Sequence, residues 1–459
     1  MPDEHASTGP KLKQTLGFWQ VALYGLGSML GAGIYGLIGK AAGTLGNAVW
    51  LAFAAAMVAA LLTGLSYACV GSRHPKAGGA AFVTHQAFRK DWLAYVVGIA
   101  VMMSGLTSMA TGSQVMAETI LKEFKWDVNA KLVAVGIVFF IGCIIYRGIR
   151  ESMWVNIICT IVEAGGLLFI IAVGVKYWGS VNYLELPPTP PGEPQTGLSV
   201  LILQGAVLTF YSFIGFEDLL NVSEEVKDAP RNLPRGLIAA MLVSTVIYMA
   251  VAITAVSVVP WKDLAVSPTP LMDVASIATG NAGIKHTYFF ITLFAVGNTA
   301  LLNYIMGSRL LYGMSNQGLM PRVLGKVHPE RHTPHVAVGV LFFIVMSLIL
   351  IGGVKQLAEA TVMLLLVVFT VVNASLVILK CRPNEPKGHF EVPLLVPLLG
   401  AFVCATLIVI RVQAALESKD MGTKSAPLIA GAIIGIGLAM YLVLKPKRVV
   451  LDEEVSNVD

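Results

Sequence analysis

Long apolar segments alternate with short polar connections from residue 17 to residue 444. Each apolar segment holds about 20 residues, the length that an α-helix needs to cross the hydrocarbon core of a bilayer. The pattern therefore predicts an all-α membrane protein with twelve transmembrane helices. The predicted spans are 17–39, 47–70, 92–118, 130–147, 153–175, 199–221, 236–258, 285–314, 336–352, 357–379, 393–411 and 426–444.

The composition supports this class, because 56% of the 459 residues are hydrophobic and only 13% are charged. A soluble domain carries about 25% charged residues. One membrane domain, residues 17–444, is expected between two polar tails, residues 1–16 and 445–459. The five cysteines are scattered singly, without the spacing of a disulfide or metal site, so we expect no bound metal and no cofactor.

The distribution of lysine and arginine predicts the orientation. Twelve spans place both termini on one side, and 21 of the 32 lysines and arginines then lie on that side. Every arginine except Arg411 belongs to this group. Positive residues gather in cytoplasmic loops, so we expect a multi-pass protein of the cytoplasmic membrane with both termini inside. The same bias explains the net charge of +5 without a nucleic-acid partner.

The first span is interrupted at residues 27–33, which read GSMLGAG. A break at membrane depth leaves backbone N–H and C=O groups without water, so it persists only inside protein or beside a cavity. Free amides at one helix end and free carbonyls at the other suit a zwitterion or an ion. The break predicts transport of a small polar solute; a close helix crossing through small residues is the alternative.

The sixth span is interrupted in a similar way, around residues 211–216. Five spans separate the two interruptions, so two five-span repeats would have opposite orientations in the membrane. Interrupted spans at corresponding positions of two repeats indicate a transport site near the midplane. We assign repeat one to about 17–176, repeat two to about 199–380, and spans 11 and 12 to about 391–444.

Several short motifs occur in a characteristic order. Span 1 carries G-S-x-x-G-x-G-I, and residues 74–80 read HPKAGGA. Residues 210–217 read FYSFIGFE, and residues 224–234 read EEVKDAPRNLP. Residues 382–383 read RP, and residues 390–393 read FEVP. In this order and spacing the chain resembles the amino acid–polyamine–organocation (APC) transporters, which implies a leucine-transporter-like fold of five plus five inverted spans.

The resemblance implies a substrate site between the broken spans 1 and 6. The substrate carboxylate would meet the amides of residues 31–33, and its ammonium would meet carbonyls of residues 24–29 and 210–213. Tyr211 and Phe213 would form an aromatic gate, with interhelical packing as their alternative role. The implied substrate-binding residues are Ser28, Met29, Gly31, Ala32, Gly33, Phe210, Tyr211, Phe213 and Ile214.

Two carboxylates lie close to these breaks. Glu163 is near the middle of span 5, where an ionised carboxylate is costly and indicates a functional site. We predict that Glu163 binds and releases a coupling proton; hydrogen bonding to broken-helix amides is the alternative. Some relatives carry a lysine here, so Glu163 departs from their pattern. Glu217 matches an acidic position that connects substrate binding with gating in the family, or it stabilises a helix end.

Sodium coupling is the competing arrangement, and it needs hydroxyl groups of span 8 facing the carbonyls of span 1. Asn298 and Thr299 mark the candidate ion site, but span 8 lacks a Ser-Thr pair. We therefore expect H⁺ as the coupling ion. Cys69 is a further departure, because relatives often have a glutamate at this place.

These features predict a secondary active transporter of amino acids that works by alternating access and proton symport. An exchanger of amino acids or polyamines is the alternative. We do not expect an enzyme, because the chain has no H-E-x-x-H and no G-x-S-x-G motif. A channel is disfavoured, since two unlike broken helices do not form a ring of identical ligands. The expected partners are an amino acid substrate and the lipid bilayer.

Overall fold

The computed structural model describes residues 16–74, 79–147, 152–188, 197–220, 223, 226–316, 319–328, 333–383, 385–418 and 421–444. Most of both predicted tails lies outside these residues, as do parts of two motifs, residues 75–78 and 224–225. Within the described residues the regular structure is helical, apart from one isolated β-bridge between Leu16 and Val226.

The helices follow the predicted apolar segments. The first segment is divided into α1 (Phe18–Met29) and α2 (Ala32–Leu45). The sixth is divided into α8 (Leu198–Phe210) and two short 3-10 helices, η3 (Tyr211–Phe213) and η4 (Phe216–Leu220). The other predicted segments correspond to α3 (Val49–Arg73), α5 (Asp91–Phe124), α6 (Ala130–Arg147), α7 (Ser152–Gly174), α9 (Ala229–Val258), α12 (Ile284–Asn316), α13 (His335–Ile351), α14 (Val354–Cys381), α15 (Leu395–Glu417) and α16 (Met421–Leu444).

Nine helical segments of the described chain are long and apolar enough to cross a membrane. One of them, Ala32–Arg73, contains both α2 and α3. Two further apolar helices, Ala130–Tyr146 and His335–Ile351, are shorter. So many apolar helices identify a multi-pass membrane protein.

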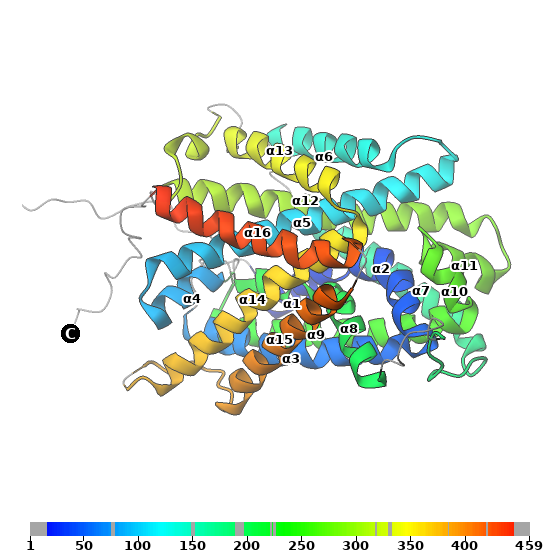
Figure 1. The fold of residues 1–459 in the computed structure, drawn as a ribbon, viewed down its shortest axis with the longest axis horizontal. Coiled ribbons are helices and arrows are strands. Elements are labelled where there is room, and N and C mark those ends of the chain that lie inside the picture. Colours follow the sequence, from blue (N-terminus) through cyan, green and yellow to red (C-terminus); the bar gives the residue numbers. More distant parts are fainter. Residues whose placement is uncertain are drawn as a thin grey trace, which may run out of the picture.

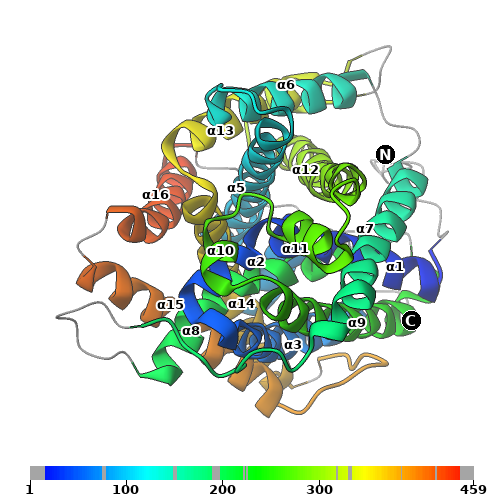
Figure 2. The same cartoon turned by 90° about the vertical axis from the view of Figure 1, so that its right-hand side faces the viewer.

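Most of the helices run along the long axis of the molecule (Figure 1). Three short helices mark its two ends: α4 (Gly79–Phe88) lies at one end, and α10 (Trp261–Val266) and α11 (Pro270–Thr279) lie at the other. Seen along this axis, α6, α13 and α16 lie at the periphery, whereas α2 lies among α8, α10 and α11 (Figure 2). The second half of the broken first segment, α2, is therefore surrounded by protein.

An aromatic cluster anchors the second half of the broken sixth segment. Phe216 of η4 packs against Tyr67 of α3 and Phe369 of α14, with ring centroids 5.6 and 5.1 Å apart. Tyr67 and Phe369 also contact each other, at 5.5 Å. Each such pair contributes about 1 kcal/mol beyond the burial of its apolar area. The cluster holds η4 in place although the helix leading to it has ended.

Candidate functional site

The first helix break is confined to two residues, Leu30 and Gly31. It is narrower than the predicted break, because α1 keeps its hydrogen bonds up to the one from the Leu30 N–H to the Leu26 carbonyl. Gly31 is the N-cap residue of α2, and no side chain of the described residues caps this helix. Since the first N–H groups of a helix have no acceptor within it, the N-terminus of α2 offers its amides to a ligand.

The second break is longer and contains a turn at Ile214 and Gly215 between η3 and η4. Gly215 has a φ of +121°, a backbone conformation that residues with a side chain rarely adopt. A Cβ at this position would also overlap the backbone carbonyl of Ser28. Glycine is therefore required both by the local conformation and by contact with the first break.

The two breaks are in direct contact. A Cβ on Gly33 would lie 2.5 Å from the Cα of Ser212, so the first turn of α2 packs on the backbone of η3. The hydroxyl oxygens of Ser28 and Ser212 are buried, and neither has a hydrogen-bond partner within the described chain. An unsatisfied buried polar group costs about 1–3 kcal/mol. A polar ligand bound between the breaks would satisfy both hydroxyls and the α2 amides.

Tyr248 of α9 joins the two breaks. Its hydroxyl oxygen lies 2.7 Å from the backbone carbonyl oxygen of Met29 and 2.7 Å from that of Ser212. A hydroxyl has one proton to donate, so Tyr248 satisfies one of these carbonyls at a time. The ring is fully buried and packs edge-on against Phe213, with centroids 5.2 Å apart.

A polar cluster beside the first break contains Glu163 of α7. Asn298 of α12 donates from Nδ2 to Glu163 Oε1 at 3.2 Å, whereas Glu163 Oε2 is buried without a partner in the described chain. Tyr35 of α2 donates to the backbone carbonyl of Glu163 at 2.6 Å. The Thr299 hydroxyl lies where a Cβ on Gly31 would be. The structure thus brings α2, α7 and α12 together through the predicted residues Glu163, Asn298 and Thr299.

The aromatic residues predicted at the gate are packed between helices. Tyr211 shares a hydrogen bond of 2.8 Å with the Ser108 hydroxyl of α5, and Phe210 packs against Phe369. Tyr211 is 4% exposed and Phe213 1%, whereas Ile214 is partly buried. Met29 and Ala32, on the other side of the contact, are also buried. Most side chains at the contact between the breaks are therefore buried, and Ser28 and Ile214 are partly exposed.

Glu217 binds the backbone of the second break. Its Oε2 accepts a hydrogen bond of 2.9 Å from the N–H of Gly215, and the residue is 8% exposed. This is the geometry of a carboxylate that stabilises a free amide at a helix end, which was the alternative role considered for it. Glu217 is therefore coupled to the conformation of Gly215, the residue that contacts Ser28.

The family model described as amino acid permease matches residues 16–439, which include both breaks and the cluster around Glu163. The chain belongs to the amino acid permease family. The resemblance predicted from the sequence motifs is thereby confirmed.

Curated relatives of this permease are named as transporters of different substrates. The methylthioribose transporter of Bacillus subtilis is 28% identical over 429 residues, covering 87% of the permease and 88% of that protein. The branched-chain amino acid permease of the same organism is 30% identical over 430 residues, covering 88% and 89%. The vacuolar cationic amino acid transporter 4 of Arabidopsis thaliana is 30% identical over 406 residues, covering 82% and 65%.

Sequence reasoning missed three polar residues around the breaks of the permease, Tyr35, Ser212 and Tyr248. Ser212 lies within the motif of span 6, but the prediction for this motif rested on its glycine and its aromatic residues. Tyr35 is flanked by glycine and aliphatic residues, which is a weak local signal, whereas Tyr248 lies close to Ser244 and Thr245 in α9 and does not stand out from them. Their hydrogen bonds join residues far apart in sequence, so the pattern along one helix did not indicate them.

Proposed function

We propose that this permease is a secondary active transporter that carries a zwitterionic amino acid by alternating access and proton symport. The observation that carries the proposal is the contact between an uncapped, buried helix N-terminus and a second helix break. Helix N-termini bind anionic groups through free amides and the helix dipole. The amides of Gly31, Ala32 and Gly33 would bind the substrate carboxylate, with the Ser28 and Ser212 hydroxyls as further donors.

The substrate ammonium would bind the carbonyl groups on the opposite side of the contact. The C-terminus of α1 carries the negative end of its dipole, and its last carbonyls include those of Ser28 and Met29. Tyr248 can donate to the carbonyl of Met29 or to that of Ser212, but not to both at once. The other carbonyl would be available for the ammonium.

The proposed coupling group is Glu163. Among the described residues no lysine or arginine pairs with its carboxyl group, and Oε2 has no partner. Protonation of Oε2 would turn an acceptor into a donor beside the break, and the contact of Thr299 with Gly31 connects this cluster to the substrate site. That same Thr299 hydroxyl is the observation that favours sodium, the second candidate, because hydroxyl oxygens are suitable ligands for a hard cation.

The membrane topology that we propose has twelve spans with both termini cytoplasmic. The segment Ala32–Arg73 reverses direction around Gly46, where φ is +63°, so it supplies part of span 1 and all of span 2. Dividing this segment in two raises the nine long segments to ten. The two shorter apolar helices, Ala130–Tyr146 and His335–Ile351, bring the number of proposed spans to twelve. The bias of arginines toward one side supports the orientation.

Helix contacts support the proposed inverted repeat. If span 1 corresponds to span 6 and span 2 to span 7, each contact in one repeat predicts a second. The contact of α1 with α9 (spans 1 and 7) corresponds to that of α8 with α3 (spans 6 and 2). The contact of α7 with α12 (spans 5 and 8) corresponds to that of α14 with α5 (spans 10 and 3).

The first test is thermal stabilisation of the purified permease by a panel of L-amino acids, polyamines and methylthioribose at two pH values. Ligand that binds only the folded protein raises the melting temperature by mass action. We expect stabilisation by one class of amino acid and none by its carboxyl-amide derivative. Stabilisation by polyamines or by methylthioribose alone would contradict the role of the α2 amides, because these ligands carry no carboxylate.

Transport into liposomes then separates the modes of coupling. A proton symporter concentrates the amino acid when an inward proton gradient is applied, in buffers with or without sodium. If accumulation of the amino acid requires a sodium gradient, the coupling ion is Na⁺ and not H⁺. Uptake that occurs only against amino acid loaded inside would identify an exchanger.

Gly31 offers a matched test of the site. We expect Gly31→Ala to weaken substrate binding at least tenfold, because the Cβ overlaps the Thr299 hydroxyl and obstructs the α2 amides. In the double variant with Thr299→Ala, the Cβ of residue 299 lies 3.4 Å from the new methyl group, an ordinary contact. The double variant should recover stability but not binding. Recovery of both stability and substrate binding would mean that Gly31 serves packing alone. The single variant Thr299→Ala is the control for the loss of the threonine hydroxyl.

A further inference from the structure

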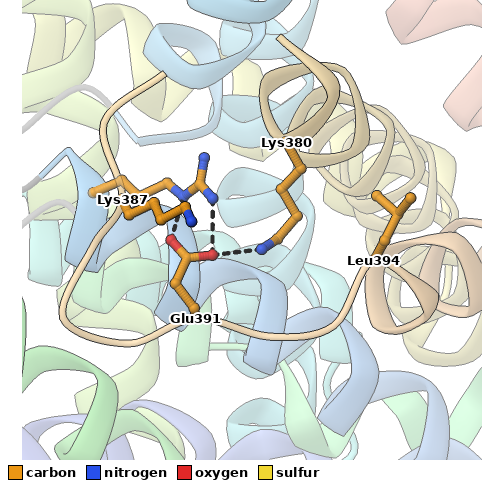
Figure 3. Close-up of a pocket in the computed structure, with 5 residues that line it drawn as sticks. Lys380, Lys387, Glu391 and Leu394 are labelled. Atoms are coloured by element: carbon orange, nitrogen blue, oxygen red, sulfur yellow. Dashed lines mark hydrogen bonds and ion pairs between the residues drawn. The ribbon is translucent and has the colours of Figure 1, made fainter. Parts of the chain in front are cut away.

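A second polar site lies at the end of the molecule where α3 and α14 end and α15 begins. A cavity of about 380 Å³ is lined there by Arg73, Lys380, Lys387, Glu391 and Leu394. Figure 3 shows Lys380 and Glu391 directed toward each other. Lys387 lies to their left and Leu394 to their right in this view. The cavity is separate from the two helix breaks, since none of their residues lines it.

Glu391 is held by the two innermost cations of the cavity. Arg73 donates to its two carboxylate oxygens from Nε at 2.7 Å and from Nη2 at 2.8 Å, and Lys380 donates at 2.5 Å. Burial disfavours the charged carboxylate, but the hydrogen bonds from Arg73, Lys380 and the Gly388 N–H outweigh it and lower the pKa of Glu391 to about 2. Glu391 therefore stays ionised at any physiological pH.

The charges of the cavity do not balance. Three cationic side chains face one carboxylate, so two positive charges are left over. Lys387 is exposed and has no ion-pair partner among the residues that the structure describes. Lys380 donates one of its three protons to Glu391, so two remain for another acceptor. An anion in the cavity would meet N–H donors from α14 and from the loop that follows it.

An apolar surface continues from the cationic cavity along α15. Leu394 lines the cavity itself and is 40% exposed. Leu395, Leu398 and Leu399 follow on the first turns of α15 and are 62%, 46% and 42% exposed. Exposed leucines on a membrane-spanning helix face lipid chains. The cationic cavity would therefore suit the anionic head group of a lipid, and the leucines of α15 would suit its acyl chains.

We propose that this cavity, formed by Arg73, Lys380, Lys387, Glu391 and Leu394, binds the phosphate group of an anionic phospholipid. Charge-assisted hydrogen bonds from arginine and lysine are the usual means of binding phosphate. Basic pockets at the cytoplasmic ends of transmembrane helices bind lipid head groups in this way. The position in the inner leaflet rests on the proposed orientation, whereas the chemistry of the cavity does not.

The test is native mass spectrometry of the detergent-purified permease titrated with phosphatidylglycerol, phosphatidylcholine or inorganic phosphate at constant ionic strength. We expect phosphatidylglycerol to bind more tightly than phosphatidylcholine. Lys387→Gln should weaken phosphatidylglycerol binding about fivefold, which corresponds to about 1 kcal/mol. Lys387→Glu should weaken it further, and Lys387→Arg should retain it.

Lys326→Gln is the matched control, because Lys326 is an exposed lysine that follows the short helix η6 (Arg322–Gly325) and does not line the cavity. It should leave lipid binding unchanged. The proposal is overturned if phosphatidylglycerol and phosphatidylcholine bind equally, or if Lys387→Gln and Lys326→Gln have the same effect. If inorganic phosphate binds as tightly as phosphatidylglycerol, the assignment of the bound anion to a lipid is overturned. Transport by Lys387→Gln in phosphatidylcholine liposomes should equal that of the unmodified permease.

Discussion

Two buried carboxyl groups in the membrane domain, those of Glu163 and Glu359, are held in opposite ways. Glu359 of α14 is paired with Arg411 of α15, which donates to it from Nε at 3.2 Å and from Nη2. Glu163 has an amide donor on one oxygen and, among the described residues, no partner on the other. Protonation of Glu359 would leave a buried guanidinium without a counterion, which is costly. Glu163 has no such constraint among the described residues, which is why we propose it, rather than Glu359, as the group that carries the proton.

The ion pair with Glu359 also explains why Arg411 is the exception in the distribution of arginines. Glu359 lies near the start of α14 and Arg411 near the end of α15, so the pair joins these helices at one end of the bundle. The two residues are 6% and 5% exposed, respectively. Arg411 is therefore a partner of a buried carboxylate rather than an orientation signal.

The largest effect on stability is expected from Glu359→Gln. The change leaves the Arg411 guanidinium buried without its counterion, which typically costs about 3–5 kcal/mol. A double variant with methionine at both positions should recover most of the loss, since apolar replacement of a buried ion pair is often neutral. Thermal unfolding in detergent measures both. A single variant as stable as the unmodified permease would contradict the structural role of the pair.

A smaller effect is expected from Glu391→Gln, which removes the carboxylate that pairs with Arg73 and Lys380. The loss should be about 2 kcal/mol, typical of hydrogen bonds to charged groups. The pKa of Glu391 is lowered from 4.5 to about 2 in the folded protein. Its stabilisation is thus complete above pH 4.5 and is lost as the pH falls toward 2. The unfolding temperatures of the variant and of the unmodified protein should therefore converge as the pH falls toward 2. A difference in unfolding temperature that stays constant with pH would exclude the ion pairs of Glu391 as its cause.

The smallest effect on stability, about 1 kcal/mol or less, is expected from Glu163→Gln. Glutamine retains the acceptor for Asn298, and no lysine or arginine of the described residues pairs with Glu163. The effect on coupling should be large: accumulation driven by a proton gradient is lost, and exchange of substrate remains. Liposome transport with and without the gradient measures both. Glu359→Gln, tested at a temperature where it is folded, should keep the response to the gradient. A Glu163→Gln variant that still concentrates substrate on a proton gradient would exclude Glu163 as the coupling group.

Properties that depend on one segment at a time were predictable from the sequence. The predicted span 130–147 coincides with α6, Ala130–Arg147, and 153–175 differs from α7, Ser152–Gly174, by one residue at each end. The location of both breaks was also predictable, because glycine at membrane depth is a local signal. The extent of the first break was not, since helical hydrogen bonds continue past Gly27 until Gly31 interrupts them.

The sequence by itself determined that this chain is a membrane protein with two broken helices, because hydropathy, length and glycine content act along each segment. The motifs in their order determined the family. Only the tertiary structure decided which faces of those helices meet. The contact of Gly33 with Ser212, the position of Tyr248 between two carbonyls, and the pairing of Glu359 with Arg411 join residues far apart in sequence. Such contacts depend on helix rotation and packing, which a pattern along one helix does not specify.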